Sequence, residues 1–139
     1  MVFWLIVIAL LALLAYVRFA PTDVARWHQK ASGEAMGETR GENSVIWREP
    51  AGADLLTRYD AVIQQTPRTE RIAGSVETGQ ATYVTRTALM GYPDYTTIGV
   101  YGENPRYVEV YGRSRFGKSD MGVNAKRVAG WRAQVEAGR

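Results

Sequence analysis

The chain contains no cysteine and only one histidine among its 139 residues. The lack of cysteine excludes disulfide bonds and thiolate chemistry. The one histidine, His28, closely follows an apolar N-terminal run, so we expect it at the membrane surface rather than in catalysis. The sequence also lacks zinc-ligand spacing, the Gly-x-Ser-x-Gly motif and the phosphate-loop motif. These absences predict a protein that is not an enzyme and that has no metal site or cofactor.

Charge is also missing from the first seventeen residues, Met1 to Val17. At about 1.5 Å per residue this run nearly spans a hydrocarbon core of about 30 Å. Four residues in and beyond this run have the aromatic or basic character that suits the lipid–water interface: Trp4, Tyr16, Arg18 and Trp27. We therefore predict a single-pass transmembrane anchor over residues 1–19, with membrane lipid as a partner.

A cleaved signal peptide and a buried helix are the two alternatives for this run. No Lys or Arg precedes it, and Arg18 lies two positions before Ala20, the best-placed small residue for cleavage. A core helix would have polar positions on one face, and the run has none. Both alternatives are less favoured than an anchor.

The basic residues Arg18, Arg26 and Lys30 follow the anchor, and only the terminal amine precedes it. The positive-inside rule would place the following domain in the cytoplasm, but long domains cross membranes largely regardless of charge. The charges therefore leave the side of the domain open.

The formal net charge is +3 and the isoelectric point is near 9.3. The two signs are interspersed, whereas a nucleic-acid-binding protein clusters its Lys and Arg on one face. We expect no nucleic-acid partner and a solvated surface that faces anionic lipid headgroups.

Residues 20–44 are predicted to form a tether, because residues 29–44 contain three glycines and few apolar residues. The short apolar segment 45–47, which precedes Pro50, predicts an edge strand. The remaining chain, residues 45–139, has the length of one small domain.

Hydrophobic periodicity predicts the elements of this domain. Apolar residues at helical spacing predict a helix over residues 54–65, with Asp54 as its N-cap. Four runs of β-branched and aromatic residues predict strands over 71–77, 81–90, 96–101 and 107–111. Val128, Trp131 and Val135 mark one stripe of a final helix, which Ser119 or Asp120 caps. The fold class is therefore α+β, with an antiparallel sheet of about four strands and two flanking helices on one face.

Eight residues form the candidate binding site or structural polar network: Arg86, Tyr92, Asp94, Arg113, Arg115, Asp120, Asn124 and Arg127. Neighbouring arginines repel one another, so we expect Asp94 and Asp120 to pair with them. Asn124 and Arg127 are three residues apart and share one helix face. The group either locks a loop to the last helix or lines a pocket for an anion or headgroup, since guanidinium groups suit phosphate.

Three segments resemble a known family. They are 20–23 with 26–28, then 82–87 leading into 89–95, and most specifically 114–128 with Trp131. Together they resemble domain-of-unknown-function family fourteen ninety-nine, whose members are small anchored proteins or lipoproteins of proteobacteria. The resemblance covers about residues 21–135. It implies an alphaproteobacterial inner membrane and a domain in the periplasm, and it implies no activity. The chain departs from the family at Gly112, where Ser or Thr is usual, and in its Gly/Glu-rich tether.

Two functions from different classes follow from these features. The first is a non-enzymatic accessory protein that docks on a larger inner-membrane complex, respiratory or photosynthetic. The alternative is an envelope module that binds an anion or lipid through an arginine-lined pocket. An unrecognised hydrolase comes last, because the chain offers no positioned base or nucleophile.

Overall fold

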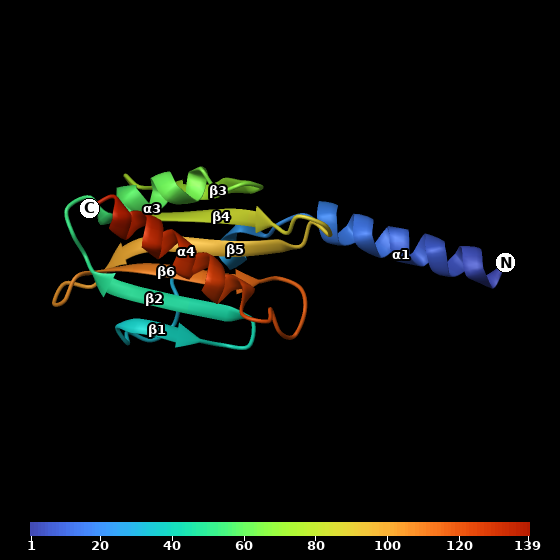
Figure 1. Ribbon diagram of the computed structural model, residues 1–139, viewed down its shortest axis with the longest axis horizontal. Coiled ribbons are helices and arrows are strands. Elements are labelled where there is room, and N and C mark those ends of the chain that lie inside the picture. Colours follow the sequence, from blue (N-terminus) through green and yellow to red (C-terminus); the bar gives the residue numbers. More distant parts are fainter.

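The computed structural model describes all 139 residues, and its helices and strands follow one another as a single α+β domain with an N-terminal extension (Figure 1). The elements in chain order are α1 (Val2–Phe19), α2 (Val24–Trp27), β1 (Gly37–Arg40), β2 (Ser44–Pro50), α3 (Leu55–Gln64), β3 (Thr69–Ser75), β4 (Gln80–Arg86), β5 (Pro93–Tyr101), β6 (Tyr107–Ser114) and α4 (Val123–Ala137).

The strands form one antiparallel sheet in the order β1-β2-β6-β5-β4-β3. The predicted four-strand meander is confirmed as β3 to β6, but the predicted number of strands is too small by two. The segment 45–47 is also not at an edge, because β2 pairs with β6 on one side and with β1 on the other. The short β1 takes the edge position and satisfies backbone groups that β2 would otherwise expose.

Helices α3 and α4 lie over one face of the sheet, as predicted (Figure 1). Apolar residues at alternate strand positions, such as Val108 and Val110, point towards them. Tyr59 and Ile63 of α3 and Trp131 of α4 are buried in the same cluster. Trp131 also donates from Nε1 to Thr66 Oγ1 at 2.8 Å, so its one polar atom has a partner.

The opposite face of the sheet is covered by residues 20–36, which we call the strap. This segment, blue in Figure 1, passes behind the sheet as seen from α3 and α4. Trp27 of α2 stacks on Tyr95 of β5 with 4.3 Å between ring centroids. The prediction of a tether over residues 20–44 is therefore wrong, because this segment packs on the sheet and adds β1 to it.

Polar contacts explain why so few apolar residues suffice to hold the strap. Glu109 is fully buried, and its carboxylate accepts from the Ala31 backbone N–H at 2.8 Å and from Arg48 Nε at 2.7 Å. Arg48 in turn donates to the carbonyl oxygens of Ser32 and Ala35. Hydropathy does not register this mode of burial, because it comes from hydrogen bonds between charged groups and the backbone.

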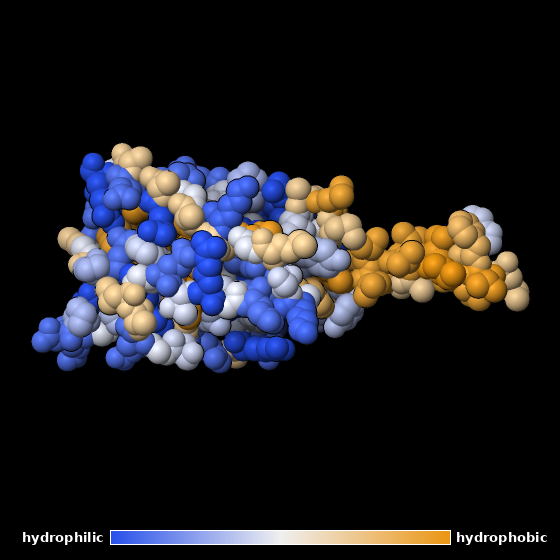
Figure 2. All heavy atoms as spheres, turned by 60° about the horizontal axis from the view of Figure 1, so that its bottom comes forward, coloured by the Kyte–Doolittle hydropathy of each residue, from blue (hydrophilic) through white to orange (hydrophobic).

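Helix α1 projects from one end of the sheet (Figure 1). Its length and composition are those of a membrane-crossing segment, which fits both an anchor and a signal sequence. Val17 is the only residue of α1 that is buried. Figure 2 shows the strongly hydrophobic surface of α1 against a domain surface that is mostly hydrophilic.

Candidate functional site

The eight predicted site residues divide between the two faces of the sheet and the loops at the end next to α1. Because side chains alternate along a strand, Asp94 points towards α4 whereas Arg86 and Arg113 point towards the strap. They therefore form two separate groups rather than one network. Tyr92 lies in the loop before β5 and is partly exposed. Pro93 and Asp94 are the first residues of β5.

The group under α4 is joined by hydrogen bonds within the protein, and Asn124 and Arg127 share one helix face, as their spacing predicted. Arg127 Nη1 donates to Asp94 Oδ2 and to Asn124 Oδ1, both at 3.0 Å. Asn124 is fully buried and donates from Nδ2 to Ser114 Oγ at 2.9 Å. These bonds join α4 to β5 and β6 and give the Arg127 guanidinium a carboxylate partner within the protein.

Two roles were predicted for Asp120, a cap of the last helix and an ion pair with an arginine. It forms no ion pair with an arginine, and its carboxylate instead accepts from the backbone N–H groups of Gly122 and Asn124 at the start of α4. Asp120 thus satisfies backbone N–H groups in the first turn of α4, although the N-cap position itself is Gly122 rather than Ser119 or Asp120. Gly112 lies beneath the same helix end, and a Cβ there would come within 3.2 Å of Asn124 Oδ1.

Arg113 also lacks the carboxylate that we expected beside it. It is buried under the strap, where it donates to Thr97 Oγ1 at 2.9 Å and to the Trp27 carbonyl oxygen. Burial lowers the pKa of Arg113 to about 10. Arg115, just beyond β6, donates to the Pro21 carbonyl oxygen at 3.0 Å. Both arginines therefore hold the strap with backbone carbonyls rather than lining a pocket.

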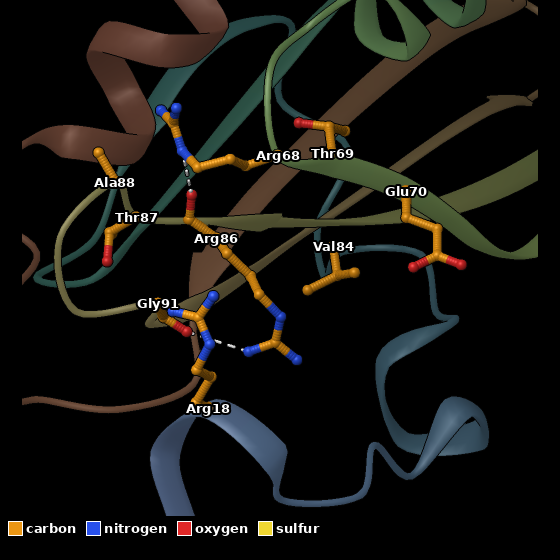
Figure 3. A pocket seen from close by; sticks show the side chains of 9 residues that line it. All are labelled: Arg18, Arg68, Thr69, Glu70, Val84, Arg86, Thr87, Ala88 and Gly91. Carbon is orange, nitrogen blue, oxygen red and sulfur yellow. Dashed lines mark hydrogen bonds between the residues drawn. The ribbon is translucent and has the colours of Figure 1, made fainter. Parts of the chain in front are cut away.

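Arg86 is a predicted site residue that lines an open cleft together with other arginines. This arginine cleft, which we define by Arg18, Arg68 and Arg86, has a volume of about 380 Å³ and lies where α1 meets the edge of the sheet (Figure 3). Thr69, Glu70 and Thr87 provide the other polar groups of its walls. Figure 3 shows that the guanidinium groups of Arg18 and Arg86 approach each other near Gly91, whereas the guanidinium of Arg68 points away from them.

Gly91 is the point at which Arg18 and Arg86 converge. Arg86 Nη1 donates to the Gly91 carbonyl oxygen at 3.0 Å. Gly91 has a φ of +69°, and a Cβ there would lie only 3.0 Å from Arg18 Nη1. Glycine therefore permits both the left-handed backbone and the close approach of Arg18.

Arg68 is held against Arg86 by its backbone and its side chain. Arg68 Nε donates to the Arg86 carbonyl oxygen at 3.0 Å, and the Arg86 N–H donates to the Arg68 carbonyl at 2.9 Å. Arg68 adopts a φ of 56°, which is uncommon for a residue other than glycine. Such backbone strain clusters at functional sites.

The charge of the arginine cleft is not balanced by the protein. None of the chain's ion pairs includes Arg18, Arg68 or Arg86. Glu70 is the only carboxylate in the walls, and it forms no ion pair with them. Guanidinium groups that share a cleft repel one another, and a bound anion relieves this repulsion.

Of the four residues predicted to lie at the membrane interface, three belong to α1 and one is buried in the domain. Trp4 and Tyr16 are exposed on α1, and Arg18 lies at its end in the arginine cleft. Trp27 is buried on Tyr95 and cannot face lipid, so the prediction that it lies at the membrane interface is wrong.

Two residues of the arginine cleft, Arg68 and Gly91, were not predicted from the sequence. The only sequence signals for them were the turn signals Pro67-Arg68 and Met90-Gly91.

Groups suited to catalysis or metal binding do not converge at the cleft. His28 lies in the strap, and its Nδ1 is 2.8 Å from Thr82 Oγ1. No group of three or more His, Asp or Glu side chains is placed to hold a metal ion. The chemistry that the arginine cleft offers is the binding of an anion by hydrogen bonds and charge.

Comparison with known proteins identifies one family. The model of the family described as "Protein of unknown function (DUF1499)" matches residues 31–135. No curated protein matches the chain. The matched region contains Arg68, Arg86 and Gly91 of the cleft and begins within the strap.

Proposed function

This chain belongs to the DUF1499 family of unknown function, and we propose that it is a non-enzymatic, membrane-anchored module that binds a phosphate-bearing anion in the arginine cleft. The observation that supports this proposal is the meeting of Arg18 and Arg86 at Gly91 with no carboxylate paired to either. Phosphate suits this arrangement, because a planar guanidinium group binds it through two parallel hydrogen bonds.

The position of the cleft favours a lipid headgroup as the source of the phosphate. Arg18 is the residue at which charge first appears after the apolar run, and headgroups lie at the level of such a residue. In this proposal α1 is retained as the anchor in a bacterial inner membrane, and the domain lies in the periplasm. A soluble phosphate ion has the same chemistry, so the test must separate the two sources.

We expect inorganic phosphate to raise the thermal unfolding midpoint of the full chain in a mild neutral detergent. Arg86→Gln should abolish this rise, because it removes one of the two guanidinium groups at Gly91. The matched control is Arg106→Gln, which removes an exposed charge outside the cleft and should leave the rise unchanged. An equal rise in all three proteins, or none in any of them, would refute the cleft as an anion site.

Native mass spectrometry then distinguishes the two sources of the anion. If the ligand is a headgroup, the protein should retain phosphatidylglycerol in preference to phosphatidylcholine, and Arg86→Gln should lose this preference by about tenfold or more, equivalent to about 1.4 kcal/mol. A phosphate-dependent thermal shift without lipid retention would instead assign the cleft to a soluble anion.

Docking on a larger inner-membrane complex, respiratory or photosynthetic, is our second proposal. It is supported by the exposure of α1, whose only buried residue is Val17 and whose sides are free to contact other transmembrane helices. Purification of the tagged chain in mild detergent should then yield stoichiometric partner subunits. Recovery of the chain alone would argue against this second proposal.

A further inference from the structure

Beside the arginine cleft, an apolar groove separates α1 from the domain. Its volume is about 740 Å³. Its apolar walls come from α1 on one side and from the β4–β5 and β6–α4 loops on the other, and they include Leu10, Leu13, Leu14, Met90, Phe116 and Met121. Nothing in the chain fills the groove.

The loops reach back along the helix that the proposed function places in the membrane. Phe116 contacts Tyr16 with 6.1 Å between ring centroids, and Gly91 lies against Arg18. The 18 residues of α1 extend about 27 Å, which is slightly less than a hydrocarbon core of about 30 Å. A helix this short needs its whole length to cross, so loops beside its last turn lie at the depth of the lipid interface.

The loop tips carry apolar side chains that the protein leaves uncovered. Leu89 is 89% exposed and Met121 is 94% exposed. Met121 has a φ of 54°, and hydrogen bonds from its own N–H to Ser119 Oγ and from Gly122 N–H to Asp120 Oδ1 fix the loop around it. A strained residue that exposes an apolar side chain to solvent indicates a surface that binds another molecule or a membrane when the protein functions.

Basic residues lie beside these tips. Lys118 is exposed in the same loop as Met121, and Arg115 precedes it. Long basic side chains next to apolar tips are typical of surfaces at the headgroup level, where the stem stays in the apolar region and the charge reaches the phosphates. Figure 2 shows hydrophobic residues on the end of the domain that adjoins α1.

We propose that the β4–β5 and β6–α4 loops insert their apolar tips, Leu89 and Met121, into the bilayer beside α1, and that lipid acyl chains fill the apolar groove. The bilayer is the occupant because the groove continues the lipid-facing surface of α1 and shares its walls with that helix. This inference rests on the proposed membrane insertion of α1, but it does not depend on an anion in the arginine cleft. It gives the domain one fixed orientation on the membrane.

The absence of cysteine permits a direct test with single-cysteine variants of the full chain. Leu89→Cys and Met121→Cys are labelled with a polarity-sensitive fluorophore and reconstituted in phosphatidylcholine vesicles, with or without lipid that carries a nitroxide quencher high on its acyl chain. Leu11→Cys in α1 is the membrane reference. Glu103→Cys, in the exposed loop between β5 and β6 at the end of the sheet away from α1, is the water reference (Figure 1).

We expect the labels at 89 and 121 to have blue-shifted emission that the lipid nitroxide quenches, as at 11, while the label at 103 stays unquenched. Labels at 89 and 121 that behave like the one at 103 would overturn the inference and leave the anchor standing. A label at 11 that also stays unquenched would refute the insertion of α1 itself. Blue-shifted emission at 89 and 121 without quenching would mean that protein covers the tips, and would also overturn the inference.

Discussion

Glu49 of β2 lies at the end of the sheet where the C-terminus meets the loop before α3. Its Oε2 accepts hydrogen bonds from Trp47 Nε1 and Tyr59 OH, both at 2.7 Å, and Oε1 pairs with Arg139. Burial by itself raises the pKa of the Glu49 carboxyl, but the hydrogen bonds from Trp47, Tyr59 and Arg139 together outweigh burial and lower the pKa below its ordinary value of 4.5. The ionised carboxylate therefore ties α3 and the C-terminus to β2.

A carboxyl whose pKa is lowered by folding stabilises the fold above its unfolded pKa and loses this contribution as the pH falls through its folded pKa. We expect Glu49→Gln to reduce the free energy of unfolding of the full chain by about 1 kcal/mol at pH 7, because the site is only partly buried. The difference from the unmodified chain should shrink below about pH 4.5. Denaturant titrations from pH 3 to 7 measure this difference in the free energy of unfolding, and the exposed Glu103→Gln is the control. A difference that does not change with pH would contradict this account.

The sequence predicted single-residue roles where the partner is local. Asn124 and Arg127 are three residues apart on one helix, and Asp120 lies just before it, so helical geometry alone brings these side chains together. The partner of Arg113 could not be predicted in this way, since it is the carbonyl oxygen of Trp27, 86 residues away. Backbone carbonyls leave no trace in residue types, and the search for a carboxylate therefore gave the wrong partner.

The same contrast holds at the level of whole elements. Alternating β-branched and aromatic residues predicted β3 to β6, and the stripe through Trp131 predicted α4, because these elements bury apolar faces. The strap and β1 escaped prediction because they bury few apolar side chains, namely Ala20, Trp27 and Ala31. They are held by backbone pairing and by the Arg48–Glu109 pair instead. The one sequence signal was Glu109 itself, a charge between Val108 and Val110 in an apolar strand.

The Arg48–Glu109 pair gives a test of how the strap is held. Its two side chains are each 1% exposed, so Glu109→Gln leaves the Arg48 charge buried without a counter-charge. We expect this variant to lower the free energy of unfolding by about 3–5 kcal/mol. Amide hydrogen exchange should also become faster in residues 29–36, because Glu109 accepts the Ala31 N–H.

The matched control is Asp54→Asn, which makes the same change in an exposed pair with Arg58 and should cost less than about 1 kcal/mol. If residues 29–36 exchange at the same rate in Glu109→Gln as in the unmodified chain, the strap is not held by this pair. Such a result would assign its attachment to the Trp27–Tyr95 stack and the bonds of Arg113.

For the molecule as a whole, both proposed binding surfaces lie at one end. The arginine cleft and the apolar groove flank the C-terminal part of α1, while the chain ends at the other end of the sheet (Figure 1). An antiparallel sheet with helices on one face and the strap on the other is a rigid body. In the proposed arrangement, contacts at its α1 end therefore set the orientation of the whole domain relative to the membrane. The C-terminus lies at the end of the sheet away from α1 and is suited to carry a reporter.

The side of the membrane is the last prediction. The positive-inside rule favours the cytoplasm because of Arg18, Arg26 and Lys30. Two of these residues belong to the strap, which folds with a domain large enough to be translocated largely regardless of its charge. We therefore expect alkaline phosphatase fused after Arg139 to be active, as in the periplasm. Leu11→Arg places a charge near the middle of α1 at a cost of about 2.5–3.5 kcal/mol and should strongly reduce this activity. An inactive phosphatase fusion, together with a fluorescent-protein fusion that is bright in the cytoplasm, would reverse the orientation.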